Sequence, residues 1–218
     1  MADLRLAAPA SLHRADVRVD PTTHTYWLGA QRLPGVTEIL TGLGLLTLPP
    51  DAPTVRLAAA RQRGSAVHLA LSFQHEGTLD PASVDPRLDG YLFAWDAFCA
   101  RHMADFRPRY VEQPQADPLL GFAGTPDVEG LHGTDDRSPW VVEVKTGPFQ
   151  PGHLLQVAGY TLLVRAGLTH GWPTGIVVTL RADGGFALYR ATSRDQTIFR
   201  AALMVWQHHL ATEARHGR

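Results

Sequence analysis

The chain has 218 residues, of which 44% are hydrophobic and 19% charged, and its formal net charge is −1. A chain of this size and composition buries one sizeable core or at most two small ones, and it is too apolar for a disordered protein. The near-neutral charge excludes a generally basic surface, so any bound nucleic acid would need a local basic groove. A single cysteine, Cys99, excludes an internal disulfide and a cysteine-ligated cluster.

The N-terminal stretch "MADLRLAAPA" lacks the hydrophobic core of a signal peptide. No apolar run approaches the ~20 residues that cross a bilayer. The sequence therefore predicts a cytoplasmic protein with a reduced thiol and no membrane partner.

Residues 1–50 are expected to form an N-terminal hairpin and a short helix. In "DVRVDPTTHTYWLGAQRLP", apolar and polar residues alternate around two turn-forming pairs, which predicts short strands. The following "GVTEILTGLG" indicates a brief helix, with Thr37 as its N-cap and Gly42 and Gly44 closing it.

Residues 51–106 are expected to be the helical part. The pattern is helical over residues 54–75, with Gly64 predicted as a break between two pieces. A second helix is predicted to begin at Asp85-Pro86. Its apolar residues recur at helical spacing and are assigned to the core: Leu88, Leu92, Trp95, Phe98 and Cys99.

Residues 107–218 are expected to form the sheet core with flanking helices. The segments "RYVEQ", "LLGFAGTPDVEGL" and "PWVVEVKT" predict three consecutive strands, followed by a helix over residues 152–166. The stretch "TGIVVTLRADGGFALYR" predicts a hairpin, and an amphipathic helix follows over residues 194–212. The order of elements predicts one α/β domain over residues 1–218, with a central mixed β-sheet flanked by helices.

The strand "VVEVKTG" contains two charged residues, Glu143 and Lys145, within an apolar run. Side chains alternate along a strand, so these two share one face. One interpretation is an ion pair on the wet face of an edge strand, which contributes little. The other is a catalytic face, because Asp127 lies on the preceding strand. Two carboxylates at adjacent strand ends suit a hard divalent cation, and a nearby ammonium suits phosphate chemistry.

The segments "TPDVEG" and "VVEVKTG" resemble the signature of the PD-(D/E)XK nuclease superfamily, with Pro126-Asp127 and Glu143-Val144-Lys145 at the matching positions. The predicted helix "LLQVAGY" then matches the Gln-x-x-x-Tyr motif of the RecB-like branch through Gln156 and Tyr160.

Upstream, "RGSAVH" resembles the Arg-Gly-(Thr/Ser)-x-x-His element of the same branch and places His68 at its histidine. The four elements occur in the family's order. The N-terminal "YWLGAQRLPGVTEIL" is similar to the start of phage and mitochondrial genome-maintenance exonucleases of this branch.

This resemblance implies a restriction-endonuclease-like core and a metal-dependent deoxyribonuclease. Mg²⁺ or Mn²⁺ would be held by four groups: His68, Asp127, Glu143 and the carbonyl of Val144. Lys145 would position and activate the attacking water, and the products would carry 5′-phosphates.

The resemblance also assigns DNA contacts. Gln156 and Tyr160 would position the strand beside the metal. Arg61 and Arg63 lie close to His68 in sequence and either line a groove for the phosphate backbone or simply solvate a helix face. Thr146 either touches the substrate or forms a turn with Gly147.

Some positions depart from the family pattern. Many relatives carry a glutamate one turn after the motif histidine, where this chain has Ser72, with Glu76 a further turn on. Glu112, before Asp127, is a second-tier candidate for the metal shell, and an exposed strand glutamate is the alternative. No iron–sulfur cluster and no nucleotide cofactor are expected, so DNA unwinding would need a separate helicase or recombination partner.

The expected activity is an exonuclease on single-stranded or end-containing DNA, in repair, recombination or phage DNA metabolism. The alternatives are a structure-specific endonuclease, a nuclease acting on RNA, and a nucleic-acid-binding subunit that keeps the fold without cleaving.

Overall fold

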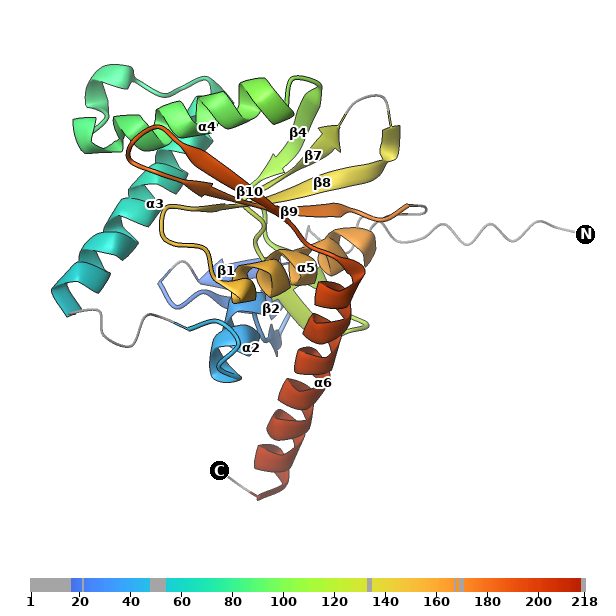
Figure 1. Ribbon diagram of the computed structural model, residues 1–218. Coiled ribbons are helices and arrows are strands. Elements are labelled where there is room, and N and C mark those ends of the chain that lie inside the picture. The colour runs from blue at the N-terminus through green and yellow to red at the C-terminus, as the bar shows by residue number, and fades with distance from the viewer. Residues whose placement is uncertain are drawn as a thin grey trace, which may run out of the picture.

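The computed structural model describes residues 17–20, 22–47, 54–132, 135–166, 168 and 171–216. A five-stranded sheet lies at the centre, in the order β10-β9-β8-β7-β4 (Figure 1). Strands β8 and β9 are parallel and the other pairs are antiparallel, so the sheet is mixed. Its strands are β4 (Phe106–Val111), β7 (Val128–His132), β8 (Asp135–Lys145), β9 (Thr174–Leu180) and β10 (Phe186–Arg190).

Helices cover both faces of this sheet. Helix α4 (Asp89–His102) packs against β9 and β10 on one face, and α5 (Pro151–Ala166) packs against β8 and β9 on the other. Helix α5 also provides the crossover that a parallel β8–β9 pair requires. The other helices in the described residues are α2 (Val36–Gly42), α3 (Thr54–Glu76) and α6 (Ser193–His216), with 3₁₀ turns η1 (Pro81–Ser83) and η2 (Pro86–Leu88). The predicted α/β class is confirmed.

Two smaller sheets stand beside the central one. Strands β1 (Val17–Asp20), β2 (Thr25–Leu28) and β3 (Gln31–Leu33) form a three-stranded antiparallel sheet, where the N-terminal alternation predicts short strands in a hairpin. Strands β5 (Gln115–Asp117) and β6 (Phe122–Gly124) form a two-stranded sheet.

The prediction of one strand across "LLGFAGTPDVEGL" is wrong. This segment contains β6 and β7, which belong to different sheets. The chain leaves one sheet and enters the other through Thr125-Pro126-Asp127, and a proline lacks the N–H that a continuous ladder needs.

Two further local predictions are wrong. Helix α3 runs unbroken through Gly64, because Val67 and Leu71 farther along it pack into the core with α4 and override the local cost of glycine. Helix α2 begins after Gly35, whose N–H donates to Glu38 Oε2 at 3.2 Å, so Thr37 is not its cap. The Thr37 side chain accepts a long-range hydrogen bond instead.

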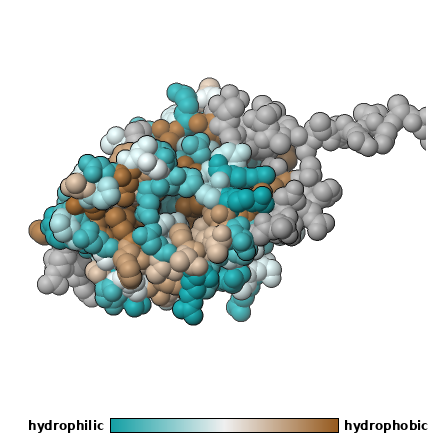
Figure 2. Space-filling model, turned by 90° about the horizontal axis from the view of Figure 1, so that it is seen from above, coloured by the Kyte–Doolittle hydropathy of each residue, from teal (hydrophilic) through white to brown (hydrophobic). Residues whose placement is uncertain are grey.

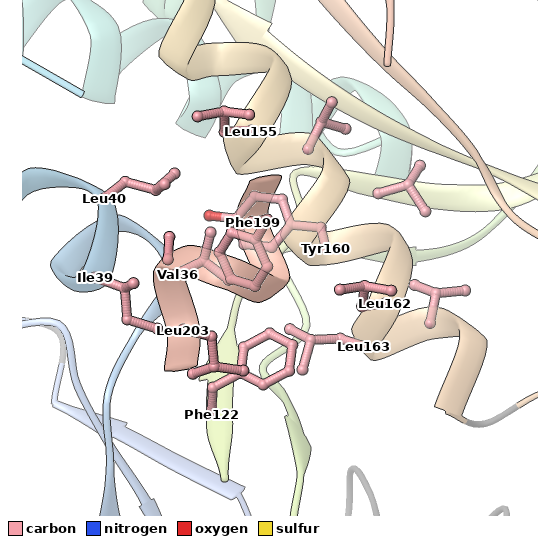
Figure 3. Packing of buried hydrophobic residues seen from close by; sticks show 14 of the residues in the cluster. Val36, Ile39, Leu40, Phe122, Leu155, Tyr160, Leu162, Leu163, Phe199 and Leu203 are labelled. Carbon is pink, nitrogen blue, oxygen red and sulfur yellow. The ribbon is translucent and has the colours of Figure 1, made fainter. Parts of the chain in front are cut away.

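The two faces of the central sheet bury separate apolar clusters. One unites α2, α5, α6 and β6, and Figure 3 shows its side chains meeting around Tyr160, Phe199 and Phe122. The other lies beneath α3 and α4 and includes Val142 and Val144. The first cluster also includes Val141 of β8. Residues of β8 therefore pack into both clusters, which fix the position of this strand.

The surface seen from above the α4 side mixes hydrophilic groups with scattered hydrophobic ones (Figure 2). Among the described helices, none is long and apolar enough to cross a membrane.

Candidate active site

Glu143 and Lys145 share one face at the end of β8, as the strand period predicts. Glu143 is only 2% exposed, and its Oε1 lies 2.6 Å from Lys145 Nζ. Among the described residues, no group donates a hydrogen bond to the other oxygen, Oε2, although it is buried. A buried carboxylate oxygen without a donor is costly, so this pair does not match the expectation for a surface ion pair.

Asp127 reaches the same place from the neighbouring strand. Val128 pairs with Val142 in the antiparallel β7–β8 ladder, so Asp127, one residue earlier, lies beside Glu143. The backbone N–H of Val144 donates to Asp127 Oδ2 at 2.6 Å. This bond fixes one carboxylate oxygen and leaves Oδ1 to face α3.

His68 of α3 lies beside Glu112 and Asp127 at this end of the sheet. Its Nδ1 lies 3.1 Å from Glu112 Oε1 and 3.4 Å from Asp127 Oδ1. One ligand atom from each of the three residues falls within 4.8 Å of the others. We call His68, Glu112 and Asp127 the acidic cluster. Imidazole and carboxylate ligands at this separation suit a divalent cation.

Glu112 lies immediately after β4, in a left-handed backbone conformation with φ +48°. Its N–H donates to the carbonyl of Asp127 at 3.0 Å, which holds the residue in place. Such backbone strain in a non-glycine residue persists only where the surrounding structure enforces it, and it concentrates at functional sites. Glu112 is therefore part of the cluster, whereas the sequence left it equally well explained as an exposed strand glutamate.

The charges in the site act strongly on one another. The Asp127 carboxylate raises the pKa of His68 well above its ordinary value. Burial alone would raise the pKa of Asp127, but the charges of His68 and Lys145 hold it below its usual value. Burial, together with the charge of Asp127, raises the pKa of Glu143 to about 8. Burial likewise raises the pKa of Glu112. A bound cation would relieve this crowding of carboxylates.

Gln156 and Tyr160 lie on one face of α5, as their spacing predicts. The Gln156 Nε2 donates to Tyr160 Oη at 3.2 Å and to Thr37 Oγ1 at 3.3 Å. Its Oε1 is buried and has no partner in the described part of the chain. The sequence did not indicate that Thr37 is a partner of Gln156, because the two residues are 119 positions apart and no local pattern links them.

A cleft of about 1010 Å³ joins these groups. Its walls come from α2, α3, the β1–β3 sheet and the ends of β7 and β8. His68, Asp127, Glu143, Lys145, Gln156 and Tyr160 all line it, and so do Glu112 and Ser72. Arg32 also lines it, paired with Glu38 at 2.7 Å, and the sequence did not single out either residue.

The other residues assigned by resemblance lie outside the cleft walls. Arg61 is exposed on α3, and the Arg63 guanidinium lies 5.8 Å from the centre of the Tyr91 ring. Thr146 directly follows β8 and is partly buried. Glu76 is exposed at the last residue of α3, away from the acidic cluster.

No protein-family model and no curated protein matches the chain. Among solved structures, LHK-Exo in complex with dAMP is 14% identical, with 84% of this chain and 90% of that chain covered and a TM-score of 0.44. The alkaline exonuclease LHK-Exo from Laribacter hongkongensis, in another structure, is 14% identical over 84% and 94% of the two chains, at 0.36. SSO0001 is 13% identical over 78% and 84%, at 0.29. At such distant similarity, function has to be inferred from the site's own residues.

Proposed function

We propose that this chain is a metal-dependent DNA nuclease of the RecB-like PD-(D/E)XK type, with residues 1–218 forming one nuclease domain. The observation that carries the proposal is the convergence of the acidic cluster with the buried Glu143–Lys145 pair in one cleft. Separate elements supply these groups, and burying so many charges together destabilises a fold unless they have a ligand.

The residues present fit a divalent cation. Asp127, Glu143 and His68, with the carbonyl of Val144, would hold Mg²⁺ or Mn²⁺. The Oε2 of Glu143, which has no hydrogen-bond partner among the described residues, would be one of the ligand oxygens. The imidazole makes Mn²⁺ as suitable as Mg²⁺. Glu112 would complete the shell where the family glutamate is replaced by Ser72. When bound, such a cation polarises the phosphodiester and makes water more acidic.

Lys145 has the second chemical role. Its ammonium is held beside Glu143, and the pKa of Lys145 is raised, because burial alone would lower it but the Glu143 and Asp127 charges outweigh burial. Lys145 therefore stays charged, orients the attacking water and stabilises the negative charge that builds on the phosphoryl oxygens.

The cleft would hold the DNA strand. The Oε1 of Gln156, which has no partner among the described residues, and the hydroxyl of Tyr160 would bind the nucleotide beside the acidic cluster. Thr146, which directly follows β8, would contact the same DNA strand. Arg61 and Arg63 would contact the phosphate backbone beyond the cleft along α3. We favour an exonuclease on single-stranded or end-containing DNA.

The test is cleavage of labelled linear single-stranded, linear duplex and closed circular DNA, with Mg²⁺, Mn²⁺ or chelator, by wild type and Lys145→Ala. Metal-dependent loss of linear DNA that spares circles and is lost in the variant is the expected result. Cut circles would instead indicate an endonuclease. Binding without cleavage, with either metal, would indicate a non-cleaving subunit, and matched RNA substrates test the choice of nucleic acid.

A further inference from the structure

A second cavity, of about 220 Å³, borders the acidic cluster. His68, Glu112 and Asp127 line both this cavity and the large cleft, and so does Ser72. A ligand bound at the acidic cluster would therefore lie next to both the cleft and the cavity. The mechanism proposed above uses only the cleft and gives the second cavity no role.

The cavity has the size and the walls of an aromatic-ring pocket. An apolar cavity of about 150 Å³ holds one benzene ring, so 220 Å³ accommodates a fused bicyclic ring. Its walls are largely apolar and include Trp95, Cys99, Phe106, Val128 and Val144. Burial raises the pKa of the Cys99 thiol to about 12, so this wall residue is uncharged.

One polar group in the cavity wall, the side-chain oxygen of Gln74, lacks a hydrogen-bond partner among the described residues. Gln74 lines the cavity, and its Nε2 donates to Asp96 Oδ1. A carboxylate only accepts hydrogen bonds, so the contact with Asp96 identifies the nitrogen end of the Gln74 amide and leaves the oxygen at the other end. The Oε1 of Gln74 is left buried, with no donor among the residues that the structure describes. A ligand that carries an N–H donor would satisfy this oxygen.

We propose that this cavity receives the unstacked nucleobase of a nucleotide adjoining the scissile phosphate, with preference for a purine that carries an exocyclic amino group. One sugar separates a nucleobase from its phosphate, so a phosphate at the acidic cluster brings that base to the cavity. The ring fills the apolar space, and the amino group donates to Gln74 Oε1. Unstacking costs least in single-stranded DNA, so the cavity favours unpaired ends. This inference rests on the proposed function.

The test is an abasic scan. A labelled single-stranded oligonucleotide carries one abasic nucleotide, moved position by position past the cleavage point mapped with wild type. Binding to full-length Lys145→Met with Mn²⁺ is measured by fluorescence anisotropy. Removal of the base at one position beside the scissile phosphate is expected to weaken binding about ten-fold or more.

A filled cavity should remove this effect. Cys99→Phe, added to Lys145→Met, places a ring in the cavity from α4, so the intact oligonucleotide should bind no better than the abasic one. Ala100→Phe adds the same ring at an exposed position of α4 and is the matched control. Gln74→Leu supplies a second arm that tests the cavity even if Cys99→Phe does not fold. Gln74→Leu removes the acceptor oxygen. It should therefore abolish the preference for adenine over unsubstituted purine at the position where removal of the base weakens binding.

Two negative outcomes are distinguishable. Equal binding of intact and abasic DNA at every position beside the scissile phosphate would overturn the pocket and leave the nuclease proposal standing. A wild-type chain that bound no DNA with either metal would overturn the proposed function and the pocket together.

Discussion

The two faces of strand β8 differ in what they contribute to the molecule. Val142 and Val144 point to one face, are at most 1% exposed, and pack into the apolar cluster beneath α3 and α4. Glu143 and Lys145 point to the other face and bury charges beside Asp127. The first face stabilises the fold through hydrophobic burial. The second is expected to destabilise it, because buried charges cost free energy unless a ligand compensates them.

The largest expected effect comes from changing the charged face. Lys145→Met should lower cleavage about 100- to 1,000-fold, because a charge aimed at the phosphoryl oxygens is lost. The double variant Glu143→Leu/Lys145→Met should be inactive, yet as stable as wild type or up to about 4 kcal/mol more stable. End-labelled cleavage and urea unfolding measure the two effects. A double variant that is both active and less stable would reverse the assignment of this face.

The pH dependence of metal binding should be the next largest effect. The pKa of Glu143 is raised to about 8 and that of His68 well above its ordinary value, so in the metal-free protein each keeps its proton to a higher pH than an ordinary glutamate or histidine does. A cation must displace these protons. Affinity for Mn²⁺ should therefore rise with pH toward 8, by up to about ten-fold per pH unit for each proton released. Calorimetric titrations at pH 6, 7 and 8 measure this slope.

The metal-free protein should show the opposite trend. Both raised pKa values mean that the folded state binds protons more tightly than the unfolded state. Their contribution to stability is therefore fully present below the unfolded pKa values and is lost as pH rises through the folded ones. The melting temperature in chelator should fall between pH 5 and about 8. A metal affinity independent of pH, or a melting temperature in chelator that rises over this range, would contradict the raised pKa values of Glu143 and His68.

On the apolar face, Val142→Ala should cost about 2 kcal/mol of unfolding free energy, because two methyl groups leave a fully buried position. Cleavage per folded molecule should stay close to that of wild type. Chemical unfolding and activity below the melting transition measure the two. Lost activity at full folding would mean that this face also takes part in the chemistry.

The smallest effect is expected at Thr37. Thr37→Val removes the acceptor of the Gln156 amide, and the loss of one partly buried hydrogen bond should cost about 1 kcal/mol. Without this bond the Gln156 side chain is held in place less firmly, which should weaken DNA binding several-fold. Thr41→Val is the matched control, since Thr41 lines the same cleft but, within the described part of the chain, its hydroxyl bonds only to backbone carbonyls of its own helix. Equal effects of the two variants would argue against a role for the Thr37–Gln156 bond.

The period of β8 predicted which of its side chains lie together. Alternation alone placed Glu143 and Lys145 together, and the neighbouring strand brought Asp127 to them, as the structure shows. Local patterns could not show the rest. Glu112 joins His68 because the chain turns through a left-handed residue after β4, and Thr37 meets Gln156 through packing of α2 on α5. Gly64 fails as a helix break for the same reason, since tertiary packing overrides local preference.

The most direct test of the account is a calorimetric titration of Mn²⁺ into the metal-free protein. Wild type is compared with Asp127→Asn and with Asp89→Asn, which makes the same charge change at an exposed position of α4. Wild type and Asp89→Asn should bind Mn²⁺ alike, whereas Asp127→Asn should bind at least about ten-fold more weakly. Equal affinity in all three proteins, or no binding by wild type, would contradict a metal site at the end of β8.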